Sequence, residues 1–270
     1  MAYKLGWFST ARGGGSRALL KITNDYIRSG WVPAEIDFVF CSRDPGESEE
    51  TDIFVEQVKS YAIPLVCFSY QKFKAKFGSP VKVGTLPQWR LEYDREIMKR
   101  LEGFHPDLCV LAGYMLVVGP ELCTRYNMIN LHPAAPDGPK GTWQEVIWYL
   151  INARARTTGV MMHLVTPELD RGPVVAYCTF SIRGKTFDSL WQNVEQYPEG
   201  TPESQTARNA LFDTIRRHGI AREFSLITTT IKAFSDGKIK ITPGKKVVDT
   251  RGQEITGYDL TGDIDRQIVV

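Results

Sequence analysis

Two segments of the chain carry side chains suited to acyl chemistry. Asn130 and His132 lie two residues apart at the end of an apolar run, and Asp170 lies in a turn that follows a second apolar run. Alternate residues of a strand point to the same face, so Asn130 and His132 should face one pocket. An amide, an imidazole and a carboxylate can supply an oxyanion donor, a proton carrier and a group that tunes it. We therefore take these three residues as candidate catalytic residues.

Their chemistry would suit an amine that attacks a formyl carbon. The carbonyl oxygen then becomes an oxyanion, and the attacking nitrogen must lose a proton. The amide of Asn130 can donate to that oxygen, and one such donor is typically worth about 2.7–4 kcal/mol of the barrier. A protonated His132 can donate to the same oxygen, because a nearby carboxylate such as Asp170 favours the imidazolium. Asp170 can also relay the proton through water.

The same residues have structural explanations. An Asn-x-His-Pro sequence can form a turn in which the amide binds backbone, and Asp170 can cap a turn or pair with Arg171. Chemistry is favoured by the combination of all three residues in one chain downstream of a glycine-rich loop. His163 fits a supporting role at the site and a structural role equally well. The four histidines lack a spacing such as H-E-x-x-H, so we expect no metal site.

A glycine-rich turn between the first apolar run and the first helical pattern is a second candidate site. Three consecutive glycines permit close backbone approach, and the following helix offers unpaired N–H groups to an anion. Ser16 can act as the N-cap or as a phosphate ligand, and Arg12 would add a charge-assisted contact. The run also fits the dinucleotide pattern G-x-G-x-x-G/A, but no acidic residue at the end of the second strand supports it. We favour an anion such as a substrate phosphate over a dinucleotide or a plain flexible turn, with the candidate ligands Gly13, Gly14, Gly15, Ser16 and Arg17.

Short apolar runs alternate with helical patterns around these residues. This alternation predicts an α/β fold, a Rossmann-like, mostly parallel sheet with right-handed crossovers and helices on both faces. The strands at 159–165 and 174–182 are separated only by a turn and should form an antiparallel hairpin at a sheet edge. The polar stretch 195–206 should be a surface loop, and the tail after Gly237 should hold a small hairpin. The other strands are expected at 5–9, 36–41, 64–68, 108–112 and 128–131, and the helices at 16–28, 52–61, 89–101, 120–126, 143–153, 187–194, 207–217 and 220–234.

The bulk properties narrow the class of protein. The 270 residues can bury a full core, which we divide into a catalytic domain at 1–240 and a C-terminal extension at 241–270. A net charge of +2 gives no electrostatic argument for binding nucleic acid or membranes. The five cysteines form no C-x-x-C pair, so we expect buried, reduced thiols in a reducing compartment. The N-terminus resembles no signal peptide and no apolar stretch reaches about 18 residues, so we expect a cytoplasmic protein.

Three spaced motifs resemble the formyl-tetrahydrofolate-dependent formyltransferase family. They are VLAGYM at 110–115, INLHP at 129–133 and MHLVTPELDRGPV at 162–174. The likeness spans about residues 3 to 240 and is strongest from 108 to 178. It implies a Rossmann-like fold that does not bind a dinucleotide, and 10-formyltetrahydrofolate as the co-substrate.

The resemblance also implies residue roles. The family's catalytic asparagine, histidine and aspartate match Asn130, His132 and Asp170, and its phosphate-binding glycine loop matches 13–17. Glu223, in a segment that resembles the family's closing helix, matches a glutamate that contacts the amine substrate. The folate pterin is implied to lie against two segments, whose residues are Met115, Leu116, Val117 and Val118, and Val165, Thr166, Glu168 and Leu169.

The chain departs from the family pattern mainly where the acceptor should bind. The loop is usually Gly-Asn-Gly-Ser-Asn, whereas here Arg17 replaces the last amide, and Leu116 stands where an arginine is expected. The stretch 134–143 differs from the usual Ser-Leu-Leu-Pro type of loop. The polar loop at 195–206 and the tail after Lys240 are additions. These changes leave formyl chemistry intact and place the acceptor in question.

We therefore expect a formyltransferase that moves a formyl group from 10-formyltetrahydrofolate to the primary amine of a small phosphorylated molecule. The leading acceptor is phosphoribosylglycinamide of purine biosynthesis, and an amino sugar nucleotide is an alternative. A formyltetrahydrofolate deformylase would usually carry an extra N-terminal domain, and a tRNA formyltransferase a longer C-terminal domain than 238–270 provides. An NAD(P)-dependent oxidoreductase and an inactive folate- or nucleotide-binding protein are the alternatives from other classes. Whether the chain forms a homodimer is left open.

Overall fold

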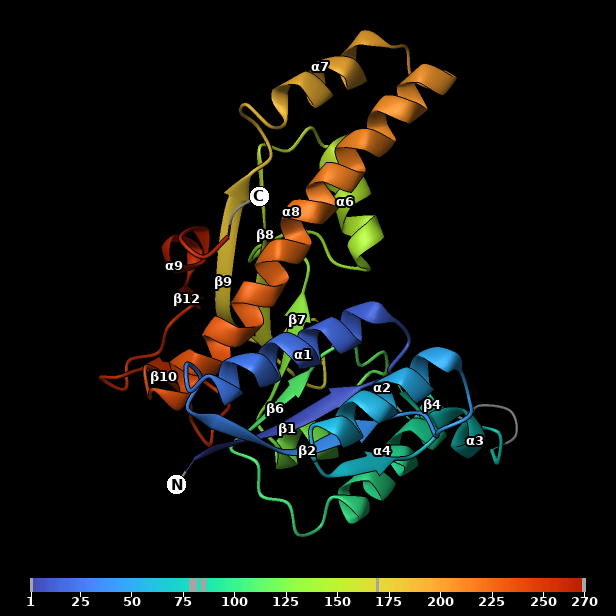
Figure 1. Cartoon of the computed structure of the whole chain (residues 1–270), viewed down its shortest axis with the longest axis vertical. Coiled ribbons are helices and arrows are strands. Elements are labelled where there is room, and N and C mark those ends of the chain that lie inside the picture. Colours follow the sequence, from blue (N-terminus) through green and yellow to red (C-terminus); the bar gives the residue numbers. More distant parts are fainter. Residues whose placement is uncertain (1, 78–81, 84–85, 169, 269–270) are drawn as a thin grey trace. The chain divides into compact units, whose positions relative to one another are not determined.

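Strands and helices alternate over much of the chain (Figure 1). The computed structural model describes residues 2–77, 82–83, 86–168 and 170–268. The strands are β1 (Tyr3–Ser9), β2 (Ala34–Cys41), β3 (Leu65–Cys67), β4 (Lys82–Val83), β5 (Leu86–Pro87), β6 (Leu108–Leu111), β7 (Met128–His132), β8 (Thr157–Leu164), β9 (Val174–Ser181), β10 (Ile239–Ile241), β11 (Val247–Asp249) and β12 (Tyr258–Asp259). The helices are α1 (Gly14–Arg28), α2 (Glu49–Ser60), α3 (Tyr70–Lys74), α4 (Gln88–Arg100), α5 (Pro120–Arg125), α6 (Trp143–Asn152), α7 (Asp188–Gln196), α8 (Pro202–Ser235) and α9 (Thr261–Asp265).

The main sheet has eight strands in the order β12-β9-β8-β7-β6-β1-β2-β3. The pairs β1–β2, β1–β6, β2–β3 and β6–β7 are parallel, as strand–helix–strand connections require. β8 and β9 are neighbours in the sheet and are joined by a turn, which confirms the predicted hairpin. The two-residue strand β12 pairs with β9 and forms the edge of the sheet beyond the hairpin. β10 and β11 form the small antiparallel hairpin that was predicted after Gly237.

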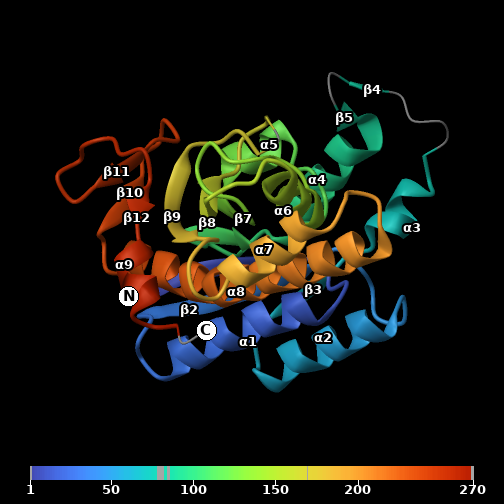
Figure 2. The same cartoon turned by 90° about the horizontal axis from the view of Figure 1, so that it is seen from above.

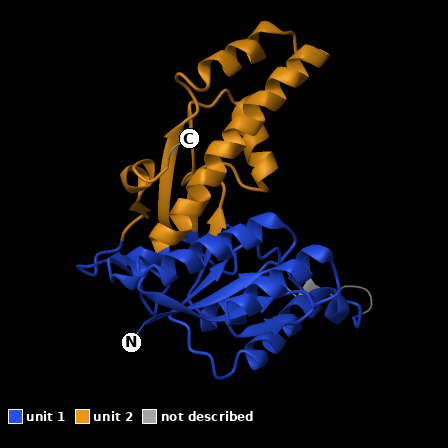
Figure 3. Cartoon of the chain, viewed as in Figure 1, with its two compact units in different colours: residues 1–130, 163–173, 231–254 blue, residues 131–162, 174–230, 255–270 orange. Residues whose placement is uncertain are grey.

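The chain divides into two compact units (Figure 3). Unit 1 comprises residues 1–130, 163–173 and 231–254, and unit 2 comprises residues 131–162, 174–230 and 255–270. β7, β8 and α8 each contribute residues to both units. The expected division at residue 240 concerns the extent of the catalytic domain and stays a prediction.

Helices cover both faces of the sheet in unit 1. Figures 1 and 2 show α1 and α2 side by side along one face. On the other face Tyr93 of α4 and Leu122 of α5 pack with Phe8 and Phe40 in one buried cluster. β1 is buried on both faces from Leu5 to Ser9. Its sequence is therefore a mostly apolar run and does not alternate between apolar and polar residues.

The core of unit 2 lies between its helices and β9. Phe180 of β9 and Ile182 pack against Ile147 of α6, Trp191 of α7 and Leu211 of α8.

Helix α8 is longer than predicted. The predicted bounds of the loop at 195–206 are wrong, because α7 continues to Gln196 and α8 begins at Pro202. Thr201 caps α8 by accepting a hydrogen bond from the Ser204 N–H at 3.2 Å, and proline is favoured at the first helical position. The break expected near Gly219 is also wrong, because a glycine costs a helix only about 1 kcal/mol and α8 runs through it without interruption.

Candidate active site

Asn130, His163 and Asp170 meet in unit 1. The Nδ2 atom of Asn130 lies 3.3 Å from Nε2 of His163, and the same Nε2 lies 3.5 Å from Oδ1 of Asp170. Asn130 belongs to β7, His163 to the end of β8, and Asp170 to the turn that follows β8. The structure thus brings together two of the three predicted catalytic residues and adds His163, whose role the sequence left open.

The hydrogen bonds of His163 define what this arrangement can do. Its Nδ1 lies 3.1 Å from the Leu164 carbonyl oxygen, which can only accept, so Nδ1 carries a hydrogen. In the neutral imidazole Nε2 is then an acceptor and receives the Asn130 amide hydrogen. In the imidazolium Nε2 is a donor, so it favours the Asp170 carboxylate and no longer binds the amide. The Asn130 amide carries two hydrogens, so it can donate one to a neutral His163 and still offer the other to a substrate oxygen.

The turn that carries Asp170 is closed by backbone contacts. The Leu164 N–H donates to the Pro173 carbonyl and the Val165 N–H donates to the Met128 carbonyl, both at 2.8 Å. Gly172 packs so closely that an added Cβ would lie 1.7 Å from the Leu164 carbonyl oxygen. Asp170 adopts a φ of 51°, a left-handed conformation that aspartate tolerates better than most residues.

The predicted folate segments have exposed and anchored parts. Met115 is 58% exposed, which is unusual for a large apolar side chain, whereas Val118 is buried. Leu116 and Val165 pack against the same core cluster of unit 1, so both segments are anchored on it. Thr166 Oγ1 donates to the Glu168 carbonyl at 3.1 Å, and both residues lie in the turn before Asp170. Leu169 lies outside the described residues.

A buried ion pair fastens the segment around Val117. Arg90 and Asp94, one turn apart on α4, are 2% and 1% exposed and pair at 2.6 Å. Arg90 Nε donates to the Val117 carbonyl at 2.6 Å, and Asp94 Oδ2 accepts from the Gly119 N–H at 2.7 Å. Burial raises the pKa of Asp94, and the Arg90 guanidinium opposes that rise. Sequence reasoning missed both residues.

The glycine-rich turn leads directly into helix α1. The helix begins at Gly14 with Gly13 as its N-cap, so of the two roles considered for Ser16 the capping role is wrong. Because Gly13 has no side chain, it cannot cap the first-turn N–H groups, which can meet an anion beside the exposed Gly14 and Gly15. Ser16 is buried instead, and an added Cβ on Gly113 would lie 2.4 Å from its Oγ. Arg17 forms an ion pair with Glu50 of α2.

His132 lies in unit 2 and is 4% exposed. Its Nε2 lies 3.3 Å from the Pro139 carbonyl oxygen, so that nitrogen carries a hydrogen. The expected pairing of His132 with Asp170 joins residues of different units and stays a prediction.

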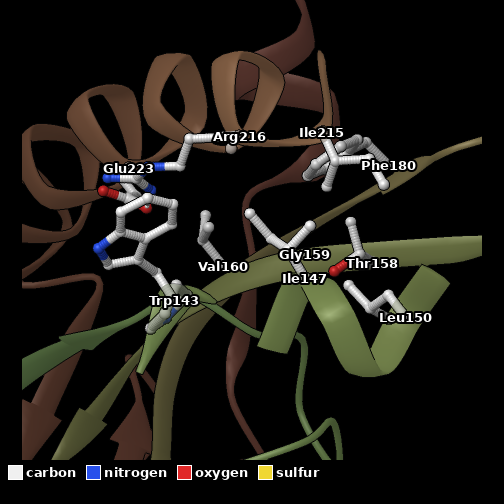
Figure 4. Close-up of a pocket in the computed structure, with 12 residues that line it drawn as sticks. Trp143, Ile147, Leu150, Thr158, Gly159, Val160, Phe180, Ile215, Arg216 and Glu223 are labelled. Carbon is white, nitrogen blue, oxygen red and sulfur yellow. Dashed lines mark hydrogen bonds and ion pairs between the residues drawn. The ribbon is translucent and has the colours of Figure 1, made fainter. Parts of the chain in front are cut away.

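Glu223 lies at a small pocket inside unit 2 (Figure 4). Its carboxylate pairs with Arg216 at 2.5 Å, and the Arg216 guanidinium lies 4.5 Å from the Trp143 ring centre. The cavity holds about 20 Å³, room for about one water molecule, and apolar side chains such as Phe180 form most of its wall. Glu223 was predicted from the sequence to contact the amine substrate, and that role stays a prediction; its neighbours Arg216 and Trp143 were not predicted.

Two properties of the described residues bear on other functions. None of the helices within them is long and apolar enough to cross a membrane. They contain no group of three or more histidine, cysteine or acidic side chains that could hold a metal ion.

Comparison with known proteins identifies the family. The model of the formyl transferase family matches residues 17–198, more than half of the chain. A phosphoribosylglycinamide formyltransferase of Haemophilus influenzae is 24% identical over 237 residues, which cover 87% of this chain and 90% of that protein. A formyltetrahydrofolate deformylase of the same organism is 32% identical over 91 residues, covering 32% of this chain and 31% of that protein. The fold matches a phosphoribosylglycinamide formyltransferase structure from Coxiella burnetii with a TM-score of 0.66 and 20% identity, over 96% of this chain and 99% of that one. The predicted family is confirmed, and the chain belongs to the formyl transferase family.

Proposed function

We propose that this formyltransferase moves the formyl group of 10-formyltetrahydrofolate to the primary amine of phosphoribosylglycinamide in purine biosynthesis. The observation that carries the proposal is the position of His163 Nε2 between the Asn130 amide and the Asp170 carboxylate. These are the groups that amine formylation needs, and they lie in a chain whose family performs formyl transfer. The free cysteines support the cytoplasm as its compartment.

The apolar surface of the two folate segments fits a planar pterin. Met115 offers an exposed thioether, while Leu116 and Val165 are supported by the core behind them. Backbone hydrogen bonds and the Arg90–Asp94 pair fix the surrounding segments, so little order has to be gained on binding. When bound, the co-substrate would supply the activated formyl carbon.

In the proposed mechanism Asn130 binds the developing oxyanion and Asp170 transfers the protons. The Asn130 amide donates to the formyl oxygen as the amine nitrogen bonds to the formyl carbon, which stabilises the developing oxyanion. Asp170 accepts the proton that the amine must lose, directly or through water, and returns one proton to the departing nitrogen as the old carbon–nitrogen bond breaks. Because the amide has two hydrogens, Asn130 can bind His163 with one and the oxyanion with the other.

An acceptor assay tests the proposal. The full chain is incubated with 10-formyltetrahydrofolate and phosphoribosylglycinamide, with an amino sugar nucleotide, or with no amine, and folate absorbance is followed. We expect turnover with phosphoribosylglycinamide, and its loss in Asn130→Ala. Turnover without an amine would instead indicate a deformylase, and turnover with the sugar nucleotide alone would overturn the acceptor.

The Arg17–Glu50 pair allows a sharper test of the phosphate site. Arg17→Ala removes the cation and should raise KM for the phosphorylated amine. Glu50→Gln removes the competing carboxylate while it keeps the arginine, so KM should fall. If both variants raise KM, the pair is structural and the phosphate does not bind there.

A further inference from the structure

Two cysteines end neighbouring strands of unit 1. Cys41 is the last residue of β2 and Cys67 the last residue of β3, and the parallel register places them opposite each other. Neighbouring strands lie about 4.8 Å apart, within the separation of about 4.4–6.8 Å that a disulfide spans between Cα atoms. Phe40 and Val66 belong to the core on the α4 face, so Cys41 and Cys67, one residue on, both point to the opposite face.

The two thiols differ in exposure. Cys41 is fully buried, whereas Cys67 is partly exposed on the strand that ends the sheet. The expectation that all five thiols are buried is therefore wrong for Cys67. An edge strand of three residues can also adjust its position more easily than an inner strand.

The hydrogen bond between the two thiols makes Cys67 the more readily ionised and so the more reactive of the two. It lowers the pKa of Cys67 and raises that of Cys41, because the Cys41 S–H donates to the Cys67 sulfur. Burial raises the pKa of both thiols. Of the charges that face Cys67, Asp44 and Glu47 raise its pKa and Lys59 of α2 lowers it, and Arg43 lowers that of Cys41.

We propose that Cys67 and Cys41 form a modification site for small-molecule disulfides such as oxidised glutathione. The Cys67 thiolate attacks one sulfur of the small disulfide, which forms a mixed disulfide and releases one thiolate. Cys41 then loses its proton and attacks the Cys67 sulfur, which closes the Cys41–Cys67 bond and releases the second thiolate. The two protein thiols are oxidised by two electrons, and the small disulfide is reduced to two thiols.

The site adjoins a hydrogen-bonded chain that reaches the proposed substrate segments. Ser42, the next residue, donates through Oγ to Thr10 Oγ1 at 3.0 Å. Thr10 Oγ1 also accepts from the Met115 N–H at 2.8 Å.

The test is peptide mapping of the folded full chain after oxidised glutathione treatment, without reduction. We expect one linked peptide pair that joins Cys41 to Cys67 and has lost the mass of two hydrogen atoms. The Cys41→Ser variant should instead accumulate glutathione on Cys67, and the Cys67→Ser variant should take up none at Cys41. The Cys178→Ser variant should behave as wild type, because the Cys41–Cys67 pair is intact in it.

The wild-type map decides the proposal even if a variant folds poorly. First modification at Cys109, Cys123 or Cys178, where burial raises the pKa, would overturn the assignment of the reactive thiol. A stable glutathione adduct on Cys67 with no linked pair would overturn the role of Cys41. The absence of any modification at glutathione concentrations that oxidise the unfolded chain would overturn the site.

Discussion

Gly172 is the position where one added methyl group should most disturb the proposed active site. In Gly172→Ala the new Cβ would lie 1.7 Å from the Leu164 carbonyl oxygen, and real Cβ contacts are not shorter than 3.0 Å. The obstacle is backbone, and both ends of the turn are tied by the hydrogen bonds of Leu164 and Val165. The turn that carries Asp170 must therefore move as a whole.

The cost follows from the kind of clash. Overpacking a well-packed site costs about 1–3 kcal/mol, and a fixed backbone obstacle places Gly172→Ala near about 3 kcal/mol. For a chain of this size about 1 kcal/mol lowers Tm by about 2–4 °C, so Tm should fall by about 6–12 °C. A displacement of about 1 Å of Asp170 should also lower kcat about 100-fold.

Gly244→Ala is the matched control. Its Cβ would meet nothing nearer than Thr242 Oγ1 at 3.8 Å, so Tm should stay unchanged or rise slightly. Both Tm values come from thermal unfolding followed by circular dichroism, and kcat from the folate absorbance assay. A Gly172→Ala protein with wild-type Tm and kcat would show that the closed turn is not the working conformation.

Three further perturbations test other parts of the argument. Asp170→Asn should lower kcat about 10²–10⁴-fold while the folate Kd, measured by fluorescence, stays nearly unchanged; near-wild-type turnover would contradict the proton role. Asp94→Asn leaves the Arg90 guanidinium buried without its counter-charge and should cost about 3–5 kcal/mol in urea unfolding, a loss that would be absent if the pair did not hold the Val117 segment. Burial and two arginines lower the pKa of His218 from its ordinary value of 6.5, so the unfolded chain binds the proton more tightly and stability should fall as pH drops below 6.5. His218→Phe should flatten that pH dependence, and an unchanged slope would show that another group causes it.

Local patterns predicted the strands but not all of their neighbours. The apolar run before Asn130 was enough to place it in β7, because strand formation depends on residues close in sequence. The approach of His163 to Asn130 depends on how two strands pair across 33 residues of chain, which no local pattern encodes. The sheet was therefore predictable, while the partner of the key amide was not.

An error in one helix boundary also concealed the pairing of Arg216 with Glu223. The break expected near Gly219 placed Arg216 and Glu223 on separate helices, so their pairing could not be anticipated. In the continuous α8 they lie seven residues apart, about two turns, and so on the same face. Thr201 and Pro202 carried the correct signal for the start of α8, but within a polar stretch they were interpreted as a loop.

The Arg17–Glu50 and Arg216–Glu223 ion pairs differ in how easily an anion could displace the carboxylate. The side chains of Arg17 and Glu50 are 25% and 43% exposed, so their pair is worth at most about 1 kcal/mol and a substrate phosphate can displace the carboxylate. Those of Arg216 and Glu223 are 24% and 12% exposed, and Arg216 also lies over the Trp143 ring. Separating that pair would leave a nearly buried carboxylate without its cation, which costs more than the exposed pair does. We therefore expect the acceptor's anion to bind at Arg17, and we expect Arg216 to hold Glu223 in place.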